Sequence, residues 1–350
     1  MNLDNNINIR KRSEINNIMS EENNDLINIK RVHKNAMVID GHCDTILEIA
    51  NKKINFGKRN TKGHLDIPRL QEGGVNVQVF AIFIEDIYKP DRALKRTLQL
   101  YDIFYQELMN NQNNISLITH CYQIEKAKKE GKIGAILAIE GGEAMEGDLG
   151  ILRVLHKLGI RLITLTWNQR NQIADGAGEV RTNSGLTEFG VKVVEEMNRL
   201  GMLIDISHLS ETGFWDVIKL SKKAIVASHS NCYTLCPHPR NLKDAQIKAL
   251  SDMGGVIGVT FVPAFLTKDK RKANIEDVLD HIDYLVKIGG INCVGIGSDF
   301  DGTKMLPLNL DGVDKMPNIT SGLLRRGYHE KDILKILGGN FLRVFMEIVG

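Results

Sequence analysis

Several features that mark particular classes of protein are scarce or missing in this sequence. The 350-residue chain has only five cysteines, an odd and scattered set, which argues against a disulfide framework and fits a reducing compartment. No segment approaches the roughly 20 apolar residues that a membrane helix needs. Acidic and basic residues nearly balance at a net charge of +2, so there is no electrostatic case for binding nucleic acid or a membrane surface. We therefore expect a soluble cytoplasmic protein with neither kind of partner.

The N-terminal segment also lacks the pattern of a secretory signal. Residues 1–30 are rich in Asn, Glu and Lys, with no apolar centre and no small-residue cleavage site. We expect residues 1–35 to form a poorly ordered extension and residues 36–350 to form a single domain, because no linker divides the rest of the chain.

Short apolar runs recur along the chain, separated by longer amphipathic segments. One such segment, Leu186–Leu200, has Thr187 as a candidate N-cap and Gly201 as a stop. Strands that alternate with helices predict a parallel sheet, and eight such units predict a (β/α)8 TIM barrel. A doubly wound open sheet is the alternative, which the absence of a GxGxxG motif after the first strand disfavours. The expected strands are Met37–Asp40, Val75–Ile84, Ile133–Ile139, Leu162–Thr166, Met202–Ile206, Ala224–Ser228, Val256–Phe261 and Cys293–Gly297.

Histidines and carboxylates stand at the carboxyl ends of several of these expected strands. In a parallel barrel the carboxyl ends meet at one mouth, where active sites are found. After the first strand, His42 and Asp44 are two residues apart, so they point to the same side of an extended chain. The whole set consists of His42, Asp44, Glu140, His208, His229, Asp299 and Asp301.

The five residues His42, Asp44, Glu140, His208 and His229 predict a metal centre. A mixed set of nitrogen and oxygen ligands suits zinc or another divalent transition ion. Five ligands exceed what one tetrahedral zinc needs when a position stays open for water. We therefore expect two ions with Glu140 as the bridge, an arrangement that lowers the pKa of a shared water and polarises a substrate carbonyl.

Each of these residues also has a simpler interpretation. A single histidine after an apolar strand is more often structural than a ligand, and a lone Glu before Gly-Gly could belong to a turn. The occurrence of such residues at separate strand ends is what favours the metal centre. The remaining histidines are assigned no chemistry, and acidic residues such as Glu143 and Asp205 are interpreted as solvated or structural.

Six blocks of the sequence resemble one family of enzymes. They are "DGHCDT", "GHLDIPRLQEGGVNVQVFA", "AIEGGEAM", "GLTEFGVKVVEEMNRLGMLIDISHLSE", "ASHSNCYTLCPHPRN" and "GIGSDFDG". Together they resemble the renal (membrane) dipeptidase family of zinc metallopeptidases, in order, from about Val38 to Phe345. The resemblance implies a TIM barrel of the metal-dependent hydrolase type, two Zn²⁺ per chain and hydrolysis of dipeptides. Relatives are often dimers, so it also allows a homodimer.

The resemblance assigns a role to each matching position. His42 and Asp44 would bind one zinc, Glu140 would bridge both, and His208 and His229 would bind the other. A hydroxide shared by the ions would attack the peptide carbonyl. Asp299 matches the catalytic carboxylate that handles the proton of this water, and Arg240, in "HPRN", matches the arginine that holds the free C-terminal carboxylate of the substrate. An arginine fork binds a carboxylate in a bidentate manner, which favours a free C-terminus one residue past the scissile bond.

The sequence departs from the family pattern after the fourth expected strand. Many active relatives have Thr-Leu-Thr-His there, and the histidine contacts the tetrahedral intermediate. This chain has Trp167, followed by Asn168, which we regard as candidate substrate-binding residues; Arg170 is a further candidate to replace the histidine. Loss of one oxyanion donor commonly costs about 10²–10³ in rate.

Two other functions stay open. Fold alone does not fix chemistry, so another binuclear-metal hydrolase acting on an ester, lactone or amide is one alternative. The other is a metal-binding protein with weak catalysis. Trp167 is the only support for the second, and the presence of Glu140 and Asp299 speaks against it.

Overall fold

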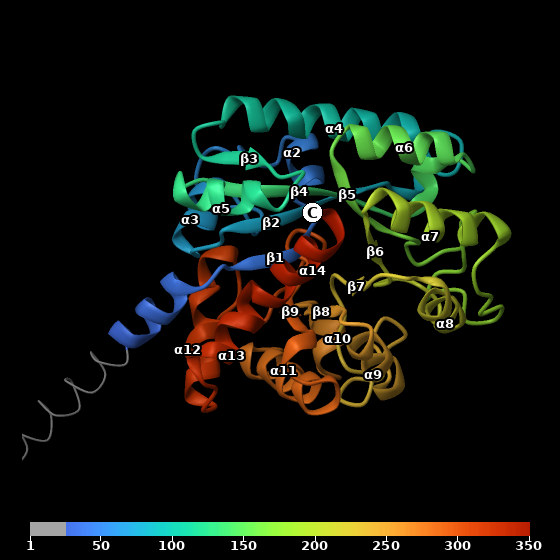
Figure 1. Cartoon of the computed structure of the whole chain (residues 1–350). Coiled ribbons are helices and arrows are strands. Elements are labelled where there is room, and N and C mark those ends of the chain that lie inside the picture. The colour runs from blue at the N-terminus through green and yellow to red at the C-terminus, as the bar shows by residue number, and fades with distance from the viewer. Residues whose placement is uncertain (1–25) are drawn as a thin grey trace, which may run out of the picture.

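The computed structural model describes residues 26–350, and the earlier part of the expected extension lies outside the described residues. Eight parallel strands form a closed barrel in the order β2-β1-β9-β8-β7-β6-β5-β4, and pairing of β2 with β4 completes the ring. Most labelled helices lie outside the labelled strands in Figure 1, whereas α14 lies across the middle of them. The expected (β/α)8 barrel is therefore confirmed. Its strands are β1 (Ile39–Cys43), β2 (Val77–Phe83), β4 (Ile133–Glu140), β5 (Ile160–Thr164), β6 (Leu203–Asp205), β7 (Val226–Ala227), β8 (Val256–Val259) and β9 (Val294–Ile296).

One further strand, β3 (Ile115–Leu117), was not expected from the sequence. It pairs with the first residues of β4, Ile133–Ala135, whereas β5 pairs with the later residues from Leu137 onward. It therefore widens the sheet beside the barrel without entering the ring. A run of three residues gives no periodic signal that sequence reading could use.

The helices follow the strands as the alternating pattern predicted. Helix α7 begins after Thr187, whose hydroxyl accepts a hydrogen bond from the Gly190 amide, and it ends at Gly201, which has a left-handed φ of 71°. The α-helices are α2 (Thr45–Ala50), α3 (Ile67–Glu72), α4 (Ala93–Asn110), α5 (Tyr122–Lys129), α6 (Leu149–Lys157), α7 (Glu188–Leu200), α8 (Glu211–Leu220), α9 (Asp244–Asp252), α10 (Pro263–Leu266), α11 (Ile275–Gly289), α12 (Pro317–Arg325), α13 (Glu330–Leu334) and α14 (Asn340–Val349). Short 3-10 or π turns are η1 (Asp86–Tyr88), η2 (Gly142–Met145), η3 (Ile291–Cys293), η4 (Val313–Lys315) and η5 (Lys335–Gly339).

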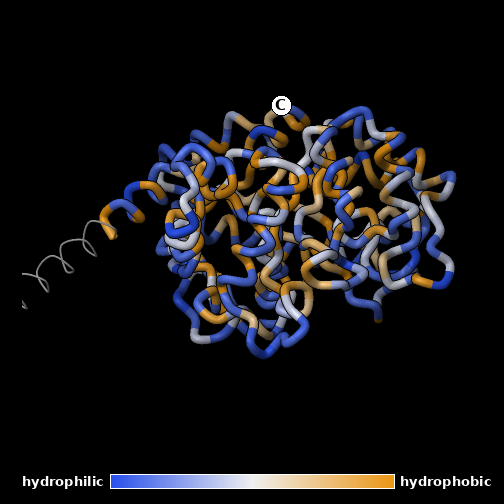
Figure 2. The backbone as a smooth tube through the Cα atoms, turned by 90° about the horizontal axis from the view of Figure 1, so that it is seen from below, coloured by the Kyte–Doolittle hydropathy of each residue, from blue (hydrophilic) through white to orange (hydrophobic). Residues whose placement is uncertain are grey.

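The last helix closes one end of the barrel. Phe341 and Val344 of α14 belong to a buried cluster with strand residues such as Ile39, Val77 and Val79. Hydrophilic stretches make up most of the outline in Figure 2, and hydrophobic stretches lie mainly inside it. Because α14 fills the end where the strands begin, the carboxyl ends of the strands remain free to form the site.

Residues 26–35, inside the expected extension, form a helix that leads into β1 (Figure 1). Val32 is fully buried, and the His33 ring lies 2.7 Å from the Thr320 hydroxyl and 2.9 Å from the Gly73 carbonyl oxygen. The packed part of the chain therefore begins before residue 36. No helix among the described residues is both long and apolar enough to cross a membrane.

Candidate metal centre

The predicted ligands lie together at the carboxyl end of the barrel. His42 is in β1, Asp44 follows it, Glu140 is the last residue of β4, and His208 and His229 follow β6 and β7. All five side chains are buried, and His42 has no exposed surface. Convergence of strand ends in a closed parallel barrel brings these distant positions together.

One carboxylate oxygen lies at the middle of the histidines. Glu140 Oε1 is 2.8 Å from His208 Nε2, 3.4 Å from His229 Nε2 and 3.8 Å from His42 Nε2. The Nε2 atoms of His208 and His229 are themselves 2.9 Å apart. This central position is the one that a bridging carboxylate requires.

Two overlapping groups of ligand atoms are compact enough to hold an ion. His42, Glu140 and His229 form one group, and His42, Asp44 and Asp299 form the other, with the ligand atoms of each group within 4.8 Å of one another. His42 is common to both groups, whereas the expected arrangement shared Glu140 alone. His208 belongs to neither group but stands against Glu140 at 2.8 Å.

The ring nitrogens that face away from this cluster have oxygen partners. His208 Nδ1 lies 2.9 Å from Asn168 Oδ1, and His229 Nδ1 lies 2.8 Å from Ser228 Oγ. An amide oxygen only accepts, so Asn168 places the proton of His208 on Nδ1 and leaves Nε2 free to bind a cation. The Nε2 atom of His42 and Oδ1 of Asp44 are buried without a hydrogen-bond partner. These orphaned atoms fit a bound metal ion.

The electrostatics of the cluster also favour a cation. Burial lowers the pKa of His42, but Glu140 and Asp44 outweigh burial and raise it to about 10. Burial raises the pKa of Glu140, but His42 and His208 outweigh burial and hold it at about 2. Burial and the charge of Glu140 raise the pKa of both Asp44 and Asp299. Without an ion, the negative charges of the carboxylates therefore keep His42 protonated. A bound divalent ion would supply the positive charge instead.

The backbone after β9 is shaped to bring two carboxylates together. Asp299 has a left-handed φ of 64°, and its amide donates to the His42 carbonyl oxygen at 3.2 Å. At Gly302 a Cβ atom would stand closer than 3.0 Å to both Asp299 Oδ1 and Asp44 Oδ2. Glycine at this position is therefore what gives the two aspartates room beside each other.

The entrance to the centre is a cavity of about 260 Å³. Trp167 forms part of its wall, packed edge-to-face on Phe83 with ring centroids 5.1 Å apart and 6.0 Å from the His208 ring. Lys89 Nζ lies 5.1 Å from the centre of the Trp167 ring and 3.5 Å from Glu143 Oε1. Trp167 thus lies where it can touch a substrate, and its neighbours hold it in place.

The two residues considered as replacements for the family histidine are both engaged. Asn168 lines the cavity, but its side-chain oxygen faces His208. Arg170 forms an ion pair with Asp175, in which Nη2 is 3.0 Å from Oδ2. Arg170 therefore pairs with a residue of its own loop and does not contact the metal centre.

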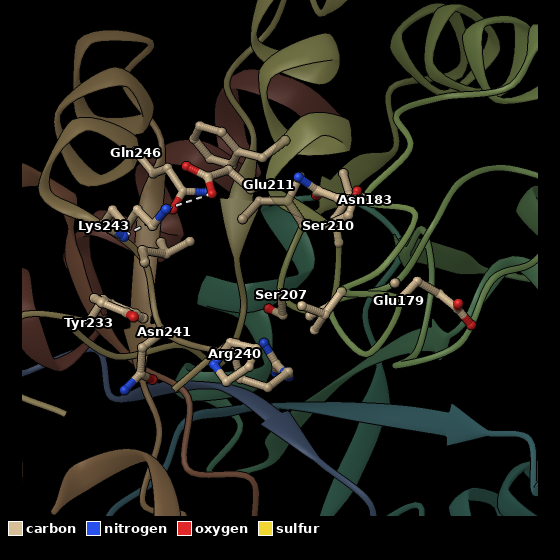
Figure 3. A pocket seen from close by; sticks show the side chains of 18 residues that line it. Glu179, Asn183, Ser207, Ser210, Glu211, Tyr233, Arg240, Asn241, Lys243 and Gln246 are labelled. Carbon is tan, nitrogen blue, oxygen red and sulfur yellow. Dashed lines mark hydrogen bonds and ion pairs between the residues drawn. The ribbon is translucent and has the colours of Figure 1, made fainter. Parts of the chain in front are cut away.

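Arg240 is buried beside the centre. Its Nη2 donates to the His229 carbonyl oxygen at 3.2 Å, while Nε and Nη1 have no hydrogen-bond partner. Burial lowers the pKa of Arg240 to about 10, although Asp299 and Glu140 raise it. Arg240 lines a second cavity of about 220 Å³, where Figure 3 shows it near Ser207. Its guanidinium is also 5.5 Å from the ring of Phe265, which lines the entrance.

Sequence reasoning missed the residues that support the ligands. Asp205, interpreted as solvated or structural, has no exposed surface and accepts hydrogen bonds from Thr164, Ser207 and Ser228. The only signals in the sequence were the serines directly before His208 and His229, and serine is too common beside histidine for them to be informative. Gly302 ends the block "GIGSDFDG", but the sequence did not show its contacts with Asp44 and Asp299, because these depend on the meeting of two distant loops.

Known proteins share both the sequence pattern and the fold. A family model described as membrane dipeptidase (peptidase family M19) matches residues 26–349. A metallopeptidase from Rhodobacter sphaeroides, solved with a phosphinate mimic of the dipeptide L-Ala-D-Ala, is 29% identical with a TM-score of 0.85, over 89% of this chain and 99% of that chain. The solved dipeptidase AC, a metallopeptidase of family M19, is 31% identical with a TM-score of 0.85, over 90% of this chain and 99% of that chain. A probable dipeptidase, PvdM, from Pseudomonas aeruginosa has a TM-score of 0.87 over 93% of this chain and 99% of that chain, and its 24% identity supports the fold alone.

Proposed function

The chain belongs to the membrane dipeptidase family, peptidase family M19, and is a metallodipeptidase; we propose that it uses two zinc ions to hydrolyse dipeptides with a free C-terminal carboxylate. His42, Asp44, Glu140, His208 and His229 would hold the ions. When bound, the ions supply a water of lowered pKa and polarise the peptide carbonyl. The proposal for the substrate follows the Rhodobacter sphaeroides relative, whose bound ligand mimics L-Ala-D-Ala.

The observation that carries this proposal is the set of acceptors around Glu140 Oε1. Three histidine nitrogens approach this oxygen within 3.8 Å, and two more carboxylates, Asp44 and Asp299, stand beside His42. Buried acceptors that face one another without enough protons repel, and a divalent cation removes the repulsion. Nitrogen and oxygen donors in this ratio suit zinc.

Asp299 is proposed to handle the proton of the reaction. Its carboxyl group lines the entrance and belongs to one of the two ligand groups. Burial and Glu140 raise its pKa, which brings it nearer to the range in which a carboxylate can take a proton from water and return it to a leaving amine.

Arg240 and the aromatic pair of Phe83 and Trp167 are proposed to orient the substrate. Arg240 follows β7, Phe83 ends β2 on the far side of the ring, and Trp167 follows β5, two strands away from β7. The two unpaired nitrogens of Arg240 would bind the terminal carboxylate. The N-terminal residue would then lie toward the aromatic wall of Phe83 and Trp167.

Four substrates test the proposal in zinc-loaded protein. We expect cleavage of an L,L- and an L,D-dipeptide, and no cleavage of a C-terminally amidated dipeptide or of a tripeptide. Replacement of Arg240 by Met, which keeps much of the side-chain length but has no charge, should remove the preference for the free carboxylate. Turnover of the amidated dipeptide by the wild-type protein would contradict the carboxylate clamp. If no peptide is cleaved and esters or lactones are, the other binuclear hydrolase takes its place.

A further inference from the structure

A single serine hydroxyl stands behind two of the histidines. Ser228 is fully buried between the end of β7 and His229. Its Oγ is 2.6 Å from Asp205 Oδ2, 2.8 Å from His229 Nδ1 and 3.4 Å from His42 Nδ1. No other side chain among the described residues has hydrogen-bond contacts with both of these rings.

The hydroxyl has one proton, and its contacts decide where that proton goes. The 2.6 Å bond to the buried carboxylate of Asp205 is the shortest, and charge-assisted hydrogen bonds of this kind are the strongest. Asp205 also accepts from the Ser228 amide at 2.8 Å, which fixes the serine against it. The lone pairs of Oγ are then left to accept N–H bonds from the two imidazoles.

This arrangement selects one tautomer for both rings. With a proton on Nδ1 of His42 and of His229, each Nε2 presents its lone pair to the cluster around Glu140. Partners of this kind orient metal-binding histidines and raise their basicity. His208 obtains the same effect separately, from Asn168.

We propose that Ser228, held by Asp205, is a positioning residue shared by both halves of the metal centre, because it orients one histidine from each of the two expected ion sites. The inference rests on the proposed ligand set. His42 is expected on one ion and His229 on the other, so loss of the hydroxyl should weaken the binding of both.

Ser228→Ala removes the hydroxyl with little change of volume. The fold should survive, because Asp205 Oδ2 still accepts from Thr164 Oγ1 at 2.6 Å and Oδ1 still accepts from Ser207 Oγ at 2.6 Å. The matched control is Ser230→Ala, since Ser230 is equally buried but its hydroxyl has no hydrogen-bond partner. Ser228→Thr restores a hydroxyl at the same position.

Zinc affinity of the whole purified chain, measured by chelator competition and with the bound zinc counted, tests the inference without reference to activity. We expect Ser228→Ala to weaken both zinc sites by about 10–100-fold, the usual effect of losing such a partner. Ser230→Ala should match wild type, and Ser228→Thr should recover most of the affinity.

The outcomes separate this inference from the proposed function. If the wild-type chain binds no zinc, the proposed metal centre is wrong. If wild type binds two ions and Ser228→Ala binds them equally well, the metal centre stands and the role of Ser228 is refuted. If Ser228→Ala fails to fold, Ser228→Thr decides: a folded Thr variant that has lost zinc affinity contradicts the proposal, and one that keeps it supports the proposal.

Discussion

Gly302→Ala should disable the metal centre while leaving the barrel folded. The added Cβ would stand closer than 3.0 Å to Asp299 Oδ1 and to Asp44 Oδ2. The φ of Gly302 lies outside the left-handed region, so alanine meets no backbone penalty there. The nearest atoms to the added Cβ all belong to the ends of the Asp299 and Asp44 side chains.

The size of the effect follows from what each displacement costs. Turning an aspartate about 30° from its preferred rotamer costs about 0.5–1.5 kcal/mol, so two such turns cost about 1–3 kcal/mol of folding free energy. That corresponds to a Tm drop of only a few degrees in a chain of this size. Catalysis is more sensitive, because a displacement of about 1 Å in a catalytic group can cost about 10² in rate, or about 2.7 kcal/mol.

Three measurements on the same preparation check this prediction: kcat/KM on a free dipeptide, bound zinc per chain, and Tm. The matched control is Gly57→Ala, whose Cβ would likewise meet the end of one flexible side chain, Asn111 Oδ1, in a loop outside the metal centre. We expect Gly57→Ala to lower Tm by a similar or smaller amount and to leave kcat/KM unchanged.

Wild-type kcat/KM and zinc content in Gly302→Ala would refute the reasoning, because the two carboxylates would then not need their observed positions. Equal losses of activity in Gly302→Ala and Gly57→Ala would also refute it, since the effect would then come from general destabilisation.

Three further predictions concern the same centre. Asn168→Ala should lower zinc affinity by about 10–100-fold, because His208 loses the acceptor at Nδ1. Asn168→Asp keeps an acceptor and should preserve the affinity. Equal zinc affinities of the two variants in chelator competition would contradict this role. Zinc uptake at pH 7 should release protons, because the pKa of His42 without zinc is raised to about 10 and the ring is protonated at pH 7. The apparent zinc affinity should therefore rise with pH up to about 10. Calorimetry in buffers of different ionisation enthalpy would detect the released protons, and binding heats independent of the buffer would contradict the prediction. Trp167→Ala should raise KM for dipeptides by about 2–10-fold, because an aromatic contact worth about 0.5–1.5 kcal/mol is lost. The zinc content should be unchanged. An unaltered KM would exclude Trp167 from the substrate site.

The barrel could be predicted because short apolar runs alternate with longer amphipathic segments along the chain. The runs that became β2 and β4 are buried nearly throughout, as expected of strands covered by helices on one side and by the core on the other. The limits of the strands were less predictable. Only Val226–Ala227 of the expected Ala224–Ser228 run is a strand, because hydrogen-bond register with its neighbours sets the ends. The predicted cytoplasmic location and the allowed homodimer remain predictions from the sequence.

The site divides into a predictable and an unpredictable part for a physical reason. Predicted ligands such as His42 and Glu140 have unusual chemistry for a strand end, so residue type and position together pointed to them. Ser228, Asp205 and Gly302 act through distances between neighbouring strands and loops. Those distances depend on register and on backbone conformation, which a single sequence does not record.

The described geometry also implies that metal binding and folding are linked. Asp44, Glu140 and Asp299 crowd their carboxyl groups into a buried space, and the pKa of two of them is raised. Without an ion, the cluster depends on the proton of His42, whose raised pKa contributes stability that is complete below about pH 6.5 and is lost as pH rises toward 10. A divalent ion supplies its charge at any of these pH values. The close placement of these acceptor groups, which destabilises the cluster without an ion, therefore favours the binding of a divalent cation. We expect the residues around Ser228 and Gly302 to keep the acceptor groups in these positions.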